Sequence, residues 1–166
     1  MRNAWTAALI LSLALGAAPA RAAVTVIGGG LAEACSHAAL SGEVAVRFED
    51  LCTNALENEF LNVRDRAGTL VNRGVLKLRR AAYADAIRDF NEAVRVKPDM
   101  GEAYVNRGAA ILGQRRFADS LPDLNRAIEL GVQEPAKAYY NRALAYEGVD
   151  DPKSAYFDYQ KALELA

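Results

Sequence analysis

The chain has 166 residues, enough for one ordinary domain and too few for two. Its 25% charged and 52% hydrophobic residues are typical of a folded protein and not of a disordered one. Because 20 basic residues stand against 21 acidic ones, the net charge is −1, which disfavours a general nucleic-acid binder. One histidine and two cysteines are too few for a structural zinc site and poor material for most acid–base catalysis.

Residues 1–22 are predicted to be a secretory signal peptide. An uncharged apolar run over residues 4–18 is followed by small-x-small patterns at 18–20 and 20–22, and we expect cleavage after Ala22. The alternative is a transmembrane anchor, but this run is shorter than the roughly 20 residues that span a bilayer. The sequence therefore predicts a secreted or periplasmic protein with no membrane span.

The two cysteines are predicted to form a structural disulfide. Cys35 and Cys52 are an even pair in the oxidising compartment that the leader implies. Their separation is not the C-x-x-C spacing of a redox-active site. The alternative is a pair of buried free cysteines.

A repeat of 34 to 35 residues organises the rest of the chain. Segments that begin at residues 69, 103 and 138 align with one another, and the tripeptide at 72–74 recurs at 106–108. Small residues recur where two helices must touch, namely Gly74, Ala86, Ala93, Gly108, Ser120, Ala127, Ala143, Ala155 and Ala162. Self-similarity at this period predicts a stack of helical units, each too small to bury its own apolar face.

These positions resemble the tetratricopeptide repeat, a 34-residue antiparallel helix pair. The large residues of its pattern are matched by Leu70, Phe90, Tyr104, Leu124, Tyr139 and Tyr159, and its closing proline by Pro98. The resemblance implies an all-α solenoid of antiparallel helix pairs, with three repeats over residues 67–100, 101–135 and 136–166. Such repeats commonly bind proteins or peptides.

Residues 23–66 are interpreted as a linker and an N-terminal helical cap, equivalent to a degenerate repeat. Helices are expected over 31–40 and 43–57, and residues 58–66 should link the cap to the array. The glycine-rich stretch 24–30 lacks the last glycine of a dinucleotide fingerprint, so we expect a flexible mature N-terminus. His37 has no nucleophile or carboxylate constellation and is expected to be an ordinary helix residue.

An arginine on each leading helix is followed 16 residues later by an aspartate on the returning helix. The expected intra-repeat ion pairs are Arg73–Asp89, Arg107–Asp123 and Arg142–Asp158. The alternative is that the arginines contact a ligand. The pairs Arg79-Arg80 and Arg115-Arg116 are expected in solvated turns.

The resemblance implies that the leading helices line a concave groove. Its candidate ligand-binding residues are Asn72, Val75, Leu78, Asn106, Ala109, Leu112, Lys137, Tyr140, Asn141 and Leu144. Val71 and Val75 stand where the carboxylate clamp of chaperone-binding repeats has polar residues, so recognition of a free carboxylate is not predicted. The three asparagines form a ladder whose amides both donate and accept, which suits the backbone of a bound peptide. The alternative is that they bridge neighbouring helices.

The sequence therefore predicts a non-enzymatic, periplasmic scaffold that binds a protein or peptide through this groove, without a metal or cofactor and without nucleic acid. A second hypothesis is a structural protein that self-assembles through its uncapped C-terminal helix. Apolar residues on that helix are Tyr156, Tyr159, Leu163 and Leu165.

Overall fold

The computed structural model describes residues 21–26 and 30–166, which contain α-helices and no strand. The helices are α1 (Leu31–Ser41), α2 (Val46–Asn58), α3 (Val63–Arg79), α4 (Tyr83–Val96), α5 (Gly101–Gly113), α6 (Phe117–Leu130), α7 (Pro135–Gly148) and α8 (Pro152–Glu164). The predicted all-α fold is confirmed.

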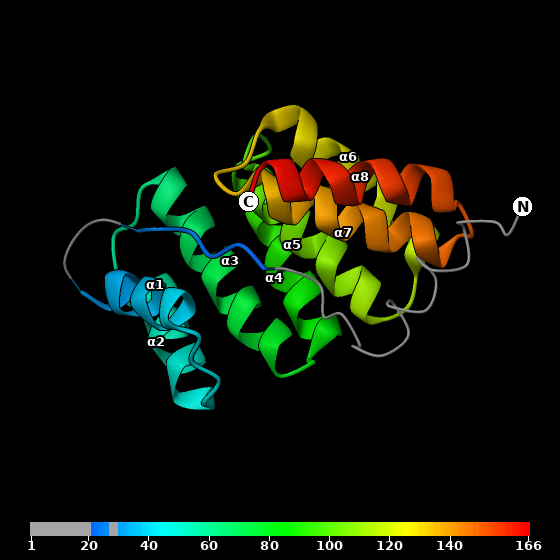
Figure 1. Ribbon diagram of the computed structural model, residues 1–166. Helices are drawn as coiled ribbons and strands as arrows, with labels where there is room; N and C mark the ends of the chain where they lie inside the picture. The colour runs from blue at the N-terminus through cyan, green and yellow to red at the C-terminus, as the bar shows by residue number, and fades with distance from the viewer. Residues whose placement is uncertain (1–20, 27–29) are drawn as a thin grey trace, which may run out of the picture.

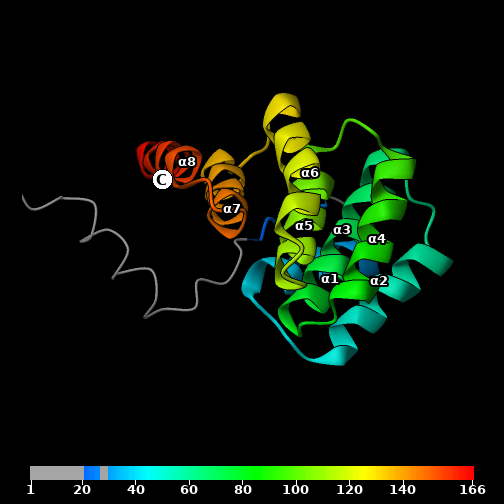
Figure 2. The same ribbon diagram turned by 90° about the vertical axis from the view of Figure 1, so that its right-hand side faces the viewer.

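The helices form four antiparallel pairs that stack into a short solenoid (Figure 1, Figure 2). The leading helices α3, α5 and α7 contact one another in sequence, and each returning helix packs against its own partner and the next leading helix. The pair α1–α2 makes the same kinds of contact with α3, so it occupies the place of a repeat at the N-terminal end of the array. This arrangement matches the predicted helical cap.

The third helix begins earlier than expected. The side chain of Asn62 accepts a hydrogen bond from the amide of Asp65 at 2.9 Å, which caps α3 and starts it at Val63. Residues 63–66, predicted to be part of a linker, are therefore helical. A similar cap starts α8, where Asp151 precedes Pro152 and accepts from the amide of Ser154.

Glycines on the leading helices allow close approach to the returning helices. A Cβ added at Gly108 would lie 2.8 Å from both Cγ and Cδ2 of the fully buried Leu124, and one at Gly74 would meet the buried ring of Phe90. The predicted small residues thus lie at helix contacts.

A second set of glycines packs between units, and sequence reasoning missed it. The ring of Tyr83 covers Gly113, and the ring of Phe117 covers Gly148. The recurrence of an aromatic residue and of a glycine at the same period is the signal that could have revealed these contacts.

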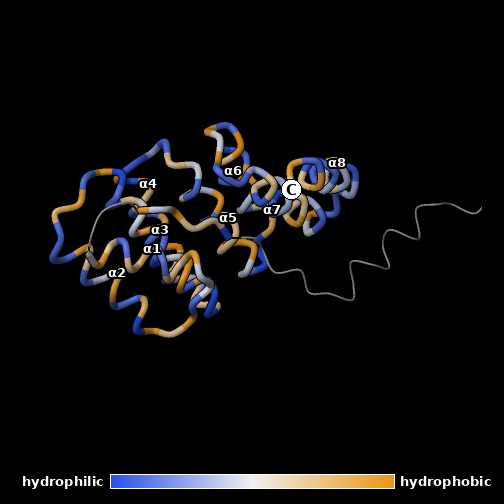
Figure 3. The backbone as a smooth tube through the Cα atoms, turned by 60° about the vertical axis from the view of Figure 1, so that its left-hand side comes forward, coloured by the Kyte–Doolittle hydropathy of each residue, from blue (hydrophilic) through white to orange (hydrophobic). Residues whose placement is uncertain are grey.

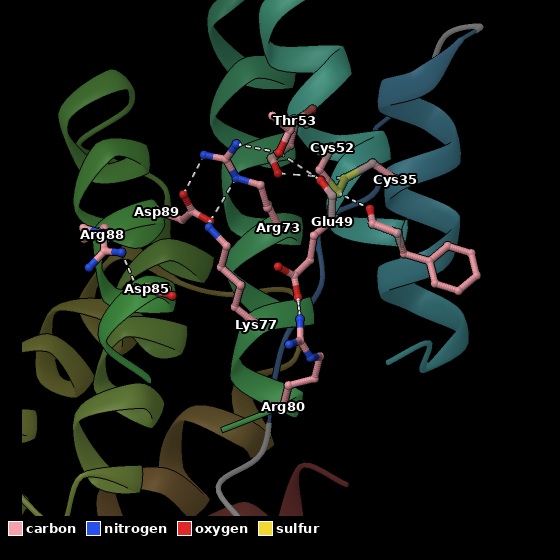
Figure 4. A network of polar contacts seen from close by, with 12 residues as sticks. Cys35, Glu49, Cys52, Thr53, Arg73, Lys77, Arg80, Asp85, Arg88 and Asp89 are labelled. Atoms are coloured by element: carbon pink, nitrogen blue, oxygen red, sulfur yellow. Dashed lines mark hydrogen bonds and ion pairs between the residues drawn. A yellow bond between two sulfur atoms is a disulfide. The ribbon is translucent and has the colours of Figure 1, made fainter. Parts of the chain in front are cut away.

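The cap is held by a disulfide between Cys35 on α1 and Cys52 on α2, with a Cα–Cα distance of 5.0 Å (Figure 4). Both cysteines are fully buried. The predicted disulfide is confirmed, and the alternative of free thiols is excluded. Among the described helices, none has the length and apolar character needed to cross a membrane.

Candidate functional site

An extended segment of the chain itself lies along the leading helices. Residues 21–26, dark blue in Figure 1, run across α3 without regular secondary structure. Asn72 on α3 holds this segment with both ends of its amide. Its Oδ1 accepts from the Val24 amide at 2.8 Å, and its Nδ2 donates to the Val24 carbonyl at 2.7 Å.

The same arrangement recurs one repeat later. Asn106 on α5 accepts from the Ala22 amide at 3.0 Å and donates to the Ala22 carbonyl at 2.5 Å. Its Nδ2 also donates to the carbonyl of Glu102, one turn earlier on α5. Each asparagine therefore presents a donor and an acceptor to one residue of extended backbone, as a neighbouring β-strand would.

Ser36 on α1 continues the polar contacts beyond Asn72. Its hydroxyl donates to the Val24 carbonyl at 3.0 Å and accepts from the Val26 amide at 3.1 Å. Ser36 is almost fully buried, so these bonds are shielded from water. Sequence analysis did not single out this serine, because only the fold brings it to the end of the asparagine ladder.

Every second side chain of the segment is buried against the array, whereas of those between them Thr25 is exposed and Ala23 packs partly buried against the cap. Ala22, Val24 and Val26 are each at most 5% exposed, whereas Thr25 between them is exposed. This period of two is that of a strand with one buried face. A Cβ at Gly68 on α3 would lie 3.0 Å from Cγ1 of Val24, so the absence of a side chain there lets the segment approach the helix.

One expectation about the N-terminus is wrong. The stretch over residues 24–30 is predicted to be flexible, but Val24 and Val26 are buried and hydrogen-bonded, and residues 27–29 lie outside the described residues. Ala22, the last residue of the predicted leader, is buried in the groove, so cleavage after it would remove a residue that Asn106 holds. The rest of the predicted leader, residues 1–20, lies outside the described residues.

The predicted groove residues fall into two groups. Those of the first two repeats are buried under the segment and the neighbouring helices, and none is more than 6% exposed: Asn72, Val75, Leu78, Asn106, Ala109 and Leu112. In the third repeat Asn141 is fully buried, whereas Lys137, Tyr140 and Leu144 on α7 are half-buried. The accessible part of the predicted groove therefore lies along α7.

Three bidentate ion pairs join the leading and returning helices. They are Arg73–Asp89, Arg107–Asp123 and Arg142–Asp158, with N–O distances of 2.6–3.0 Å. The remaining guanidinium nitrogen of each arginine donates to a side chain on the preceding returning helix, namely Thr53, Asn91 and Asn125. Each arginine therefore bridges two units, which goes beyond the intra-repeat pairing that the spacing predicted.

The first pair carries an additional cation. Lys77 Nζ lies 2.7 Å from Asp89 Oδ2, on the side away from Thr53 (Figure 4). In the other two repeats, hydrogen bonding to the partner aspartate raises the pKa of Arg107 and of Arg142. These arginines are engaged within the array, which favours their structural role over ligand contact.

The paired arginines at the turns after α3 and α5 differ from one another in their contacts. Arg79 ends α3 and donates to the carbonyls of Ala39 and Glu43, so it joins the array to the cap. Arg115 lies in the turn after α5, and Arg116 pairs with an aspartate one turn into α6. The expectation of solvated turns therefore fails for Arg79.

The C-terminal helix α8 carries both hydrophilic and hydrophobic residues along its length (Figure 3). Tyr156, Phe157, Leu163 and Leu165 on or after α8 are 41–78% exposed. Beside them, a shallow apolar depression of 460 Å³ lies between α7 and α8, lined by residues that include Tyr140, Tyr159 and Leu163.

No catalytic or metal constellation was found among the described residues. They contain no group of three or more histidine, cysteine, aspartate or glutamate side chains placed to hold a metal ion. His37 is exposed on α1, 3.9 Å from Glu33. The hydrogen bonds that Asn72 and Asn106 form with extended backbone make the asparagine ladder the candidate site.

Comparison with known proteins identifies the last helix pair. A family model described as the tetratricopeptide repeat matches residues 136–166. This pair is a tetratricopeptide repeat. No curated protein matches the chain.

Solved structures of MamA resemble the helical array as a whole. A crystal structure of MamA is 22% identical over 84% of this chain and 76% of that chain, with a TM-score of 0.66. MamA 41-end from Desulfovibrio magneticus RS-1 is 20% identical over 82% and 76%, with a TM-score of 0.57. At these identities the likeness establishes the fold and nothing further.

Proposed function

We propose that this protein is a non-enzymatic, periplasmic scaffold that binds extended peptide segments of other proteins along its leading helices. A tetratricopeptide scaffold suggests a role in protein interaction. The observation that carries the proposal is the bidentate hold of Asn72 and Asn106 on extended backbone. Because these bonds engage only main-chain atoms, the same ladder would accept other sequences.

The periplasmic location is supported by two features. The N-terminal sequence has the pattern of a cleavable leader, and the Cys35–Cys52 disulfide is of the kind that persists in oxidising compartments. Cleavage after Ala20, at the first of the two small-x-small patterns, leaves Ala22 in the mature chain, and it is this cleavage that we propose. Cell fractionation, with mass spectrometry of the purified N-terminus, tests this part of the proposal. Recovery of an uncleaved chain in the cytoplasm would contradict it.

Site-specific photocrosslinking in cells tests the binding surface. A photoreactive residue is placed at Leu144 in the accessible part of the groove, at Leu163 on the C-terminal surface, or at Arg126 on the exposed face of α6 as a control. The proposal predicts adducts with another protein from Leu144 and none from Arg126. Adducts of equal yield from both positions would refute a groove-specific partner.

A second candidate function is self-assembly through α8. The specific observation is that Leu163, which is 78% exposed, lines the apolar depression between α7 and α8. An exposed apolar patch of this kind is typical of an interaction surface. This alternative predicts crosslinked homodimers from Leu163, and a shift toward monomer on Leu163→Lys in sedimentation velocity.

A further inference from the structure

The segment over residues 22–26 contacts the array as a ligand would. Its backbone is bound by side chains of α1, α3 and α5, through hydrogen bonds that span up to 84 positions of the sequence. Its buried side chains enter apolar clusters that belong to different units, since Val24 packs with the first repeat and Ala22 with the second and third. The segment therefore fills the same positions that the proposed function assigns to a partner.

At the N-terminal end of the segment, the Arg21 side chain is partly buried. Burial lowers the pKa of Arg21, and its buried Nε has no hydrogen-bond partner within the described part of the chain. Burial, and then the charge of Arg21, also lowers the pKa of Arg79, so two guanidinium groups lie near each other. This end of the segment therefore places a desolvated charge beside the bonds to Asn106.

We propose that residues 22–26 are a tethered, exchangeable occupant of the groove, which a partner peptide of matching pattern must displace. The inference rests on the proposed function and adds its regulation and the chemistry of the partner. The partner segment is extended. It has a small residue at the position that Asn106 binds and, two residues further along, a β-branched residue at the position that Asn72 binds.

The packing around each position sets this pattern. Ala22 shares an apolar cluster with Val105, Ala138 and Ala145, which are fully buried and leave it only 3% exposed. A larger side chain at this position would overlap them, since close-packed interiors tolerate added methylenes poorly. Val24 packs against Val71 and other residues of the first repeat, where a β-branched side chain fits both the cluster and the extended backbone.

The tether sets how strongly the segment competes. A segment joined by a short linker acts at an effective concentration on the order of 1 mM. If the free segment has an intrinsic dissociation constant of about 0.1 mM, the tethered copy weakens binding of an identical peptide roughly tenfold.

The test uses a fluorescein-labelled synthetic peptide with the sequence of residues 20–27, and the full chain. Val24→Asp places a charge in the apolar cluster and should release the segment, whereas Thr25→Asp changes an exposed position and is the matched control. We expect fluorescence anisotropy to show at least tenfold tighter peptide binding by Val24→Asp than by the unmodified chain, and no gain for Thr25→Asp. A second peptide with leucine in place of the alanine of position 22 should bind Val24→Asp at least tenfold more weakly.

The outcomes separate this inference from the proposed function. Equal, measurable affinity of all three chains for the peptide would overturn the inference and leave peptide binding intact. No binding by a folded Val24→Asp chain would overturn both. Equal affinity for the two peptides would overturn the requirement for a small residue.

A measurement on the unmodified chain covers the case in which Val24→Asp does not fold. Hydrogen exchange of the amides of Ala22 and Val24 should accelerate when the unlabelled peptide is added in excess, because it displaces the segment. Unchanged exchange at a peptide concentration that saturates binding would overturn the inference. Loss of a native dimer in Val24→Asp would assign the segment to a second copy and would also overturn it.

Discussion

The carboxylate of Asp89 is paired with two cations. We therefore expect the effects of removing them on the free energy of unfolding to be strongly non-additive. Arg73 and Lys77 both lie within 3.0 Å of its carboxylate, and the aspartate side chain is 6% exposed. Removing one partner leaves the carboxylate paired with the other. Removing both leaves a buried charge without compensation, which costs about 3 kcal/mol or more.

The perturbation is the double-mutant cycle of Arg73→Met and Lys77→Met. Each single replacement should lower the free energy of unfolding by about 1–1.5 kcal/mol, the value of lost hydrogen bonds to a charged group. The double variant should lose about 4 kcal/mol, because the penalty for the orphaned carboxylate appears only then. The coupling free energy is therefore about 1–2 kcal/mol.

The free energy of unfolding of the unmodified chain, of both single variants and of the double variant is measured by urea unfolding, followed by far-ultraviolet circular dichroism with the disulfide oxidised. Arg107→Met supplies a comparison, because Asp123 pairs with no second cation among the described residues. This single replacement should orphan the carboxylate and cost about 3 kcal/mol, more than either single replacement at Asp89. Arg126→Met is the control, since its pair with Glu129 is exposed and should contribute less than about 0.5 kcal/mol. Additivity of the Arg73 and Lys77 effects would refute the reasoning.

Three further predictions concern stability. Replacing Cys35 and Cys52 by serine should lower the free energy of unfolding by about 3 kcal/mol, because it opens a loop of 17 residues. Reduction of the unmodified protein should lower the urea midpoint by the same amount as this double replacement. Gly108→Ala should destabilise by about 1 kcal/mol, since crowding of Leu124 outweighs the gain in helix propensity, and a more stable variant would contradict the close packing. Burial, followed by a hydrogen bond to a glutamate, raises the pKa of Tyr159 above its ordinary value of 10, so its contribution is complete below pH 10 and declines as the pH rises further. The urea midpoint of Tyr159→Phe should therefore fall less steeply above pH 10.

The repeat architecture could be predicted because its signals are local and repeated. The Arg–Asp spacing and the small residues at helix contacts recur three times, so each copy supports the others. A bidentate pair between facing helices requires only that the two residues share one helix pair. The same logic failed for Thr53, because the cap departs from the repeat pattern, and for Lys77 on α3, because the equivalent positions of the later repeats hold no cation.

The occupied groove could not be predicted from the sequence. A buried face of three residues, Ala22, Val24 and Val26, is too short for periodicity to distinguish a strand from a loop. Its burial also depends on side chains far along the chain. The asparagine ladder was recognised as a holder of peptide backbone, but nothing in the residues indicated that the chain would supply that backbone itself.

The bonds between the extended segment and the ladder also constrain the order of folding. Neighbouring helices can pair as soon as they are made, since solenoid contacts are local and such contacts form quickly. The amide of Ala22, by contrast, has its partner 84 residues later, on α5. Because Asn106 comes so much later in the chain, the segment remains without its complete binding surface until α5 is available. Over that interval the backbone of the segment is open to any other factor that binds extended chains.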